Sequence, residues 1–142
     1  MTWLIDTNAL SELKKRKPHP GVVRWFEEQS STSLYLSVLT LGELRKGIHA
    51  MPSGERKERF SAWLDIEIPG YFAGRIINLD LAIADRWGRL CVEAGRPLPA
   101  IDSLLAATAL VHGLTLVTRN LADFELPGVR VVNPWHSPSD AH

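Results

Sequence analysis

Three isolated acids stand beside apolar segments, where carboxylates could hold a metal ion. Asp6 directly follows the apolar run 3–5, and Glu43 lies shortly after the mainly apolar run 34–39. Asp102 opens a segment that carries no further formal charge up to His112. A carboxylate in a segment suited to burial is costly unless a positive group compensates it. Clustered carboxylates also raise one another's pKa unless a cation neutralises them. These acids therefore indicate a site for a divalent cation.

Each acid also has a purely structural interpretation. Asp6 could cap the helix that follows it, and Asn8 is an alternative cap. Thr40 and Glu43 have the spacing of a capping box, which taken alone favours a structural role for Glu43. Asp102 lies in a first helical turn, where the helix dipole stabilises a carboxylate. Its helix is too apolar for a surface position, so a functional role is favoured there.

Short apolar segments alternate with helical patterns along the whole chain. This alternation predicts an α/β domain with a mainly parallel central β-sheet flanked by α-helices. We expect one domain over residues 1–135 and a flexible tail over 136–142. The expected strands are 3–6, 34–37, 76–79, 114–118 and 129–132, and the expected helices are 9–15, 20–29, 40–50, 55–64, 81–94 and 102–112.

The predicted sheet brings the acids to one place. In a parallel sheet the carboxyl ends of the strands share one edge, and ligands bind in the crevice there. Asp6, Thr118 and Asn120 follow strands at that edge, while Glu43 and Asp102 should lie in first turns of helices that begin there. Because only oxygen ligands are on offer, the expected cation is Mg²⁺ or Mn²⁺.

Composition is that of an ordinary globular protein. The chain has 142 residues with 16 basic and 16 acidic side chains, so net charge gives no hint of a nucleic-acid partner, although a local basic patch is permitted. A single cysteine, Cys91, excludes an internal disulfide and is expected to be a buried core thiol. No signal peptide or apolar run of about 20 residues is visible, which predicts a cytoplasmic protein with no membrane partner.

The ordered series of motifs resembles the PIN-domain ribonucleases, most closely the toxins of bacterial type II toxin–antitoxin pairs, the VapC class with its FitB-like members. The resemblance covers essentially the whole chain. The matching pieces are Leu4-Ile5-Asp6-Thr7-Asn8, Leu41-Gly42-Glu43-Leu44-Arg45-Lys46-Gly47, Asp102-Ser103-Leu104-Leu105-Ala106-Ala107-Thr108-Ala109, Val117-Thr118-Arg119-Asn120 with Asp123-Phe124, and Val132-Asn133-Pro134-Trp135.

The resemblance implies a PIN-like fold and cleavage of RNA with Mg²⁺ or Mn²⁺. The family's acidic set carries over to Asp6, Glu43 and Asp102. Members often carry a fourth acid where this chain has Asn120; Asp123 is either its substitute or a turn residue. Thr118 and Asn8 are candidates for orienting the carboxylates or a bound water. Cationic side chains that could guide the RNA backbone are Lys14, Lys15, Arg16, Lys17, Arg45, Lys46 and Arg119.

The resemblance also implies partners. A small antitoxin would neutralise the toxin by covering the acidic pocket with its C-terminal segment. Toxin homodimers would assemble with it into larger complexes that bind promoter DNA only through the antitoxin.

The charged segment 55–59 is interpreted as a solvated face. The main alternative is a catalytically weak PIN-like module that binds RNA or a partner without cutting. A phosphoacceptor signalling domain ranks below both, because the acidic pair it requires is missing.

Overall fold

The computed structural model describes residues 1–136, and within them a five-stranded sheet forms the centre of the domain. Its strand order is β3-β2-β1-β4-β5, and every pairing is parallel. The predicted α/β architecture with a parallel sheet is therefore confirmed. The strands are β1 (Trp3–Ile5), β2 (Leu34–Ser37), β3 (Ile76–Ile77), β4 (Thr115–Val117) and β5 (Val131–Val132).

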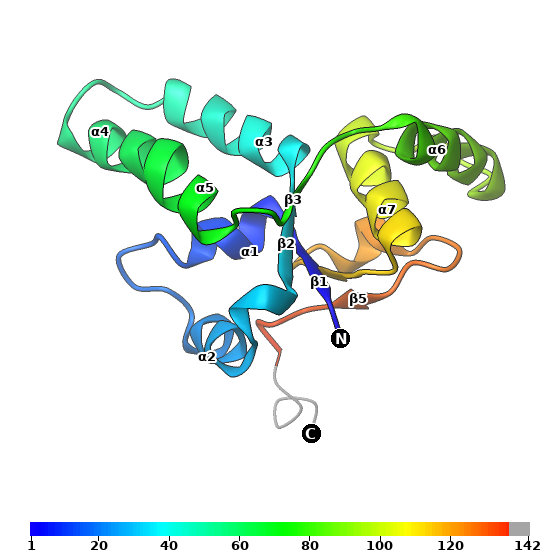
Figure 1. The fold of residues 1–142 in the computed structure, drawn as a ribbon, viewed down its shortest axis with the longest axis horizontal. Helices are drawn as coiled ribbons and strands as arrows, with labels where there is room; N and C mark the ends of the chain where they lie inside the picture. Colours follow the sequence, from blue (N-terminus) through cyan, green and yellow to red (C-terminus); the bar gives the residue numbers. More distant parts are fainter. Residues whose placement is uncertain (137–142) are drawn as a thin grey trace.

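Helices cover both faces of this sheet, with α1 to α5 on one side and α6 and α7 on the other (Figure 1). Short 3-10 helices occupy Ser31–Ser33 and Leu121–Phe124, and a π-helical turn occupies Trp63–Glu67. The α-helices are α1 (Thr7–Glu12), α2 (Pro20–Glu28), α3 (Val38–His49), α4 (Glu55–Ala62), α5 (Ile68–Tyr71), α6 (Leu81–Glu93) and α7 (Ala100–His112).

Alternating residues of the strands build the two cores. Leu4 and Leu116 belong to the core under α6 and α7, whereas Ile5 and Val117 belong to the core under the other helices. All four side chains are fully buried. Since strands buried on both faces need apolar residues at every position, this explains the continuous apolar runs in the sequence.

Two predicted helix starts were wrong. Asp6 caps α1 by accepting the backbone N–H of Thr7, and the helix ends at Glu12, so Asn8 is not the cap. Ser37 caps α3, which begins at Val38. The predicted capping box therefore does not exist, because the strand passes directly into the helix and Ser37 already meets the first free N–H groups.

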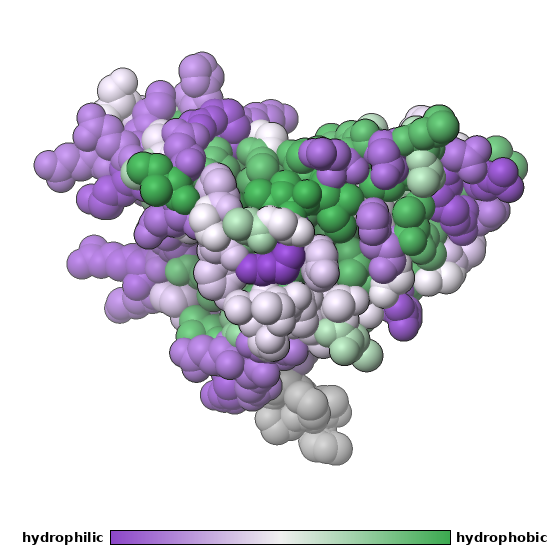
Figure 2. Space-filling view, in the orientation of Figure 1, coloured by the Kyte–Doolittle hydropathy of each residue, from purple (hydrophilic) through white to green (hydrophobic). Residues whose placement is uncertain are grey.

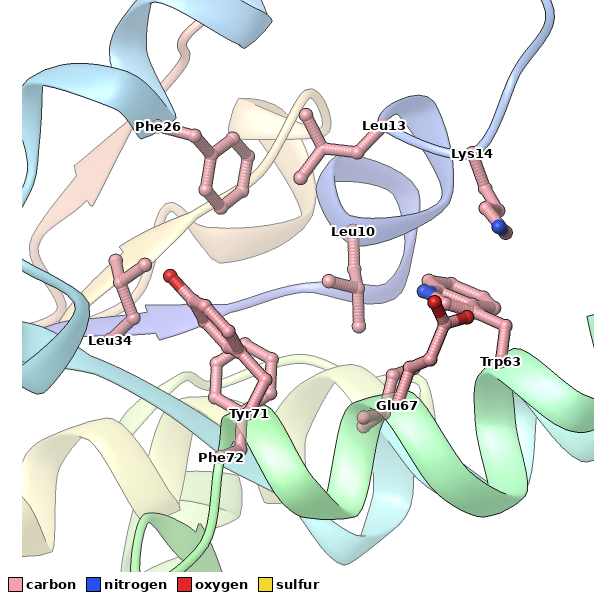
Figure 3. A pocket seen from close by; sticks show the side chains of 10 residues that line it. Leu10, Leu13, Lys14, Phe26, Leu34, Trp63, Glu67, Tyr71 and Phe72 are labelled. Carbon is pink, nitrogen blue, oxygen red and sulfur yellow. The ribbon is translucent and has the colours of Figure 1, made fainter.

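The helix expected over 55–64 is longer than predicted. Helix α4, the π-helical turn and α5 follow one another without a break, so the helical segment continues to Tyr71. Pro69 is tolerated because it stands at the start of α5, where the wider turn has already displaced the usual hydrogen bonds. An apolar groove of about 370 Å³ lies between this segment and helices α1 and α2 (Figure 3).

Burial differs from expectation at Cys91, which is only partly buried because α6 packs inward through Ile83 and Leu90.

Trp135 is buried, and residues 137–142 of the predicted tail lie outside the described residues. The domain boundary at residue 135 stays a prediction. Within residues 1–136, no helix has the length and apolar character needed to cross a bilayer.

Candidate active site

Asp6 is the anchor of the site. Strand β1 ends at the residue before Asp6. The backbone N–H of Asp6 donates to the Val117 carbonyl (2.9 Å) and so extends the hydrogen bonding between β1 and β4 by one residue. The side chain is only 5% exposed and accepts three hydrogen bonds: Oδ1 from the Thr7 N–H (2.8 Å), and Oδ2 from the Thr118 hydroxyl (2.8 Å) and the Asn8 amide (3.2 Å). Burial raises the pKa of Asp6, with a further contribution from the Glu43 charge, while these donors oppose the rise.

Thr118 joins the ends of β1 and β4. Its fully buried hydroxyl donates to Asp6 and accepts from the Asn8 amide (3.2 Å) and the Asn120 N–H (3.1 Å). Asn8 also accepts the Arg119 N–H through its side-chain oxygen (3.2 Å). Asp6 and Thr118, which were both predicted to lie at the sheet edge, contact each other there, and Asn8 contacts both of them. This network fixes one orientation of the Asp6 carboxylate.

Glu43 reaches the site from α3. Because that helix begins earlier than expected, Glu43 lies one turn inside it and not in the first turn. Its Oε1 accepts a hydrogen bond from the Thr7 hydroxyl (2.7 Å). Thr7 thus contacts two acids, Asp6 through its backbone N–H and Glu43 through its side chain. Thr7 was not among the residues predicted for the site, although its position beside Asp6 at the start of a helix was a usable signal.

Asp102 lies in the first turn of α7, as predicted. This helix is not buried on all sides, since Ile101 and Val111 are exposed, and Asp102 itself is partly exposed. Partial burial raises the pKa of Asp102 to about 6, and the charges of Asp6, Asp123 and Glu43 add to the rise. Among the described residues, none of the ion pairs found involves Asp102. Its negative charge is therefore uncompensated by protein groups.

The position of α7 is set by contacts away from the acids. Trp87 of α6 donates its indole N–H to the Ser103 hydroxyl (2.9 Å), and that hydroxyl donates to the Ala100 carbonyl (3.0 Å). Ser103 is buried and directly follows Asp102. The contact between the two helices therefore holds the first turn of α7, and with it Asp102, at the sheet edge.

The structure distinguishes the two candidates for a fourth acid. Asp123 stands in the exposed 3-10 helix after β4, and its charge acts on Asp102. Asn120 precedes the same helix without a side-chain cap and joins the site through its backbone N–H. Asp123 is therefore the candidate whose charge acts on Asp102, whereas Asn120 contributes its backbone N–H.

The donor set has the chemistry that a hard cation requires, because it consists of carboxylate, hydroxyl and amide oxygens. Among residues 1–136, no three acidic, histidine or cysteine side chains converge closely enough to coordinate one ion together. Mg²⁺ commonly keeps several waters and takes only one or two carboxylates directly. The mutual repulsion around Asp102 and the all-oxygen donors fit such a partly hydrated ion.

Comparison with known proteins places this arrangement in a family. A model described as PIN domain matches residues 3–125. The chain belongs to the PIN-domain family. Among its relatives, VapC ribonuclease Y4jK of Sinorhizobium fredii is 38% identical over 135 residues, which cover 93% of this chain and 96% of the relative. Toxin FitB of Neisseria gonorrhoeae is 36% identical over 136 residues, covering 94% and 98% of the two chains.

Solved structures share the fold of this PIN domain over nearly its full length. A structure of FitAB bound to an IR36 DNA fragment matches with a TM-score of 0.90 and 33% identity, covering 96% of this chain and 97% of that chain. A toxin–antitoxin complex from Klebsiella pneumoniae matches with a TM-score of 0.68 and 29% identity, covering 96% of this chain and all of the other.

The cationic residues of the PIN domain that were predicted to guide RNA are in several environments. Arg45 pairs with Asp65, and Arg119 stacks over the Trp135 ring at 5.3 Å. Lys46 and Lys17 are exposed. The other three, Lys14, Lys15 and Arg16, line a cleft beyond the end of α1.

Proposed function

We propose that this PIN domain is a divalent-metal-dependent endoribonuclease and the toxin of a toxin–antitoxin pair. The observation that carries the proposal is the set of carboxylates at the carboxyl edge of the sheet, where Asp102 has a pKa raised to about 6 and no compensating cation. The relatives support the reaction class, because they include proteins named as VapC ribonucleases and the toxin FitB.

In this proposal Asp6, Glu43 and Asp102 hold Mg²⁺ or Mn²⁺ directly or through water, and Asp123 is a fourth acid. A bound cation supplies a water of lowered pKa and offsets charge on the attacked phosphate. The chain's own residues organise this site. The Thr118 hydroxyl, the Asn8 amide and the Thr7 N–H hold the Asp6 carboxylate, and the Thr7 hydroxyl holds Glu43.

The same proposal includes partners. RNA is the substrate, guided by the cationic side chains predicted from the sequence. A cognate antitoxin is the neutralising partner, which the similarity to a toxin–antitoxin complex supports. Homodimers, their assembly with the antitoxin and contact with promoter DNA through the antitoxin remain parts of the proposal. Such a toxin would act in the cytoplasm, where its RNA substrate is found.

One observation favours a second candidate function. Asn120 stands where the family resemblance implies that members often carry an acid, so a PIN-like module that binds RNA or a partner with little cleavage is the alternative. The exposed Asp123, whose charge acts on Asp102, favours the nuclease, because it would be a fourth acid.

The test is cleavage of RNA by the purified protein in Mn²⁺, beside Asp6→Asn as a folded control. We expect cleavage by the parent and none by the variant. RNA ends sequenced after brief expression without antitoxin would then locate the cut sites. RNA binding without any metal-dependent cleavage would support the binding module and contradict the nuclease.

A further inference from the structure

A basic cleft opens between the end of α1 and the helix α4. It encloses about 770 Å³, and the residues that line it include five cations and no acid. The chain as a whole has no net charge, with 16 basic side chains in total, so these five are a strong local concentration. The lining residues are Ser11, Lys14, Lys15, Arg16, Arg56, Arg59 and Phe60.

Helical spacing explains the contribution of α4. Arg56, Arg59 and Phe60 are three and four residues apart, so they share one face of the helix. Glu55 and Glu58 do not line the cleft. This segment was expected to be a solvated face, and Arg56 and Arg59 are exposed. The structure adds that they line one cleft together with the segment after α1. Figure 2, in the orientation of Figure 1, shows hydrophilic residues gathered on the left of the molecule, where α4 lies.

Several of these cations are held in place by neighbouring side chains. The Arg56 guanidinium lies 5.5 Å from the centre of the Phe60 ring. The Lys14 ammonium lies 5.8 Å from the centre of the Trp63 ring, and Figure 3 shows it directed toward that ring. Lys15 pairs with the buried Glu12 at 2.9 Å. One carboxylate thus offsets one of five cations, and the cleft keeps a net positive charge.

We propose that this cleft binds the phosphate backbone of the RNA substrate as an extension of the acidic site; the inference rests on the proposed ribonuclease function. Helix α1 connects the two places, since Asp6 caps its start and the cleft lies at its end. Its six residues span about 9 Å, which a stacked strand crosses in roughly three nucleotides. A positively charged groove with an aromatic ring is the arrangement that tracks a single strand.

The decisive experiment measures binding of a fluorescein-labelled single-stranded RNA of about 16 nucleotides by anisotropy, in excess EDTA so that no cleavage occurs. The variant is Arg56→Gln with Arg59→Gln. The matched control is Arg24→Gln with Arg96→Gln, which removes the same charge from exposed positions outside the cleft. Affinity is recorded between about 50 and 200 mM salt, where counterion release sets the slope.

We expect the cleft variant to bind RNA more weakly and its logarithmic salt slope to flatten by about 1.4, because each lost phosphate contact removes about 0.7. The control should keep the parental slope. A cleft variant with the affinity and slope of the parent would overturn the proposal, as would a parent that does not bind RNA. Tighter binding of poly-glutamate than of RNA, lost in the same variant, would also overturn it by assigning the cleft to an acidic protein.

These outcomes separate the cleft from the proposed function. Cleavage of RNA by a parent whose salt slope does not depend on Arg56 and Arg59 would reject the cleft and leave the nuclease standing. A parent that binds RNA through the cleft but never cleaves it in Mn²⁺ would reject the nuclease and leave the cleft standing. Melting temperatures of both variants verify that they are folded.

Discussion

Replacing Asp102 by asparagine separates charge from shape at the centre of the site. The substitution removes a carboxylate whose pKa is raised to about 6 by partial burial and by the charges of Asp6, Asp123 and Glu43. It changes the volume of the side chain very little. We therefore expect loss of RNA cleavage together with a gain in stability of the metal-free protein.

The size of that gain follows from the pKa. A rise from 3.8 to about 6 corresponds to at most about 3 kcal/mol, because one pKa unit is about 1.4 kcal/mol. The Asp102 side chain is partly exposed, so salt and solvent screen the repulsion and about 1 kcal/mol is the realistic gain. For a chain of 142 residues this raises the melting temperature by roughly 3 to 4 °C.

The sign of the pH dependence is also fixed. Because folding raises the pKa of Asp102, the folded state holds the proton more tightly than the unfolded state. In the parent, the contribution of Asp102 to the free energy of unfolding is fully present below about pH 4 and is lost as the pH rises through about 6. The advantage of Asp102→Asn should therefore be absent at about pH 4 and complete near pH 7.

The assay is thermal unfolding in EDTA at these two pH values, with Glu27→Gln as a control that removes an exposed acid from α2. Cleavage in Mn²⁺ is measured on the same preparations. Equal melting temperatures of parent and Asp102→Asn near neutral pH would refute the electrostatic reasoning. Parental cleavage rates in the folded variant would refute the role of Asp102 as a ligand.

Three further predictions concern the rest of the site. Asp123→Ala should weaken cleavage less than Asp6→Ala, since Asp123 is exposed and Asp6 is buried and hydrogen-bonded; equal, complete loss in folded proteins would make Asp123 a principal ligand. EDTA should stop cleavage without unfolding the domain, and Mn²⁺ should raise the melting temperature of the parent far more than that of Asp6→Asn; cleavage in excess EDTA would contradict the metal mechanism. Thr118→Val should cost about 1–3 kcal/mol in urea unfolding, because it removes a buried donor to Asp6, whereas Thr118→Ser should retain most of the stability; similar losses in both would point to packing instead.

The architecture of the domain was readable from local pattern. Runs such as Leu34–Ser37 and Thr115–Val117 are short and mostly apolar, and helices separate them, so the parallel sheet followed from the alternation of elements. Helix ends were harder, because a cap depends on which side chain meets the first free N–H groups. Ser37 has that position in α3, where Thr40 was predicted, and Asp6 has it in α1, where the sequence left Asp6 and Asn8 as alternatives.

The sequence by itself determined that Asp6 and Thr118 follow parallel strands, and therefore that they would meet at one edge of the sheet. It also placed Asp102 in the first turn of its helix. Only the tertiary structure decided that Thr7 bridges two acids and that Asp123 acts on Asp102. It alone also turned the arginines of α4 toward the segment after α1. The physical reason is that position along a strand or helix is set by local periodicity, whereas hydrogen bonds and charge interactions depend on distances between groups far apart in the chain.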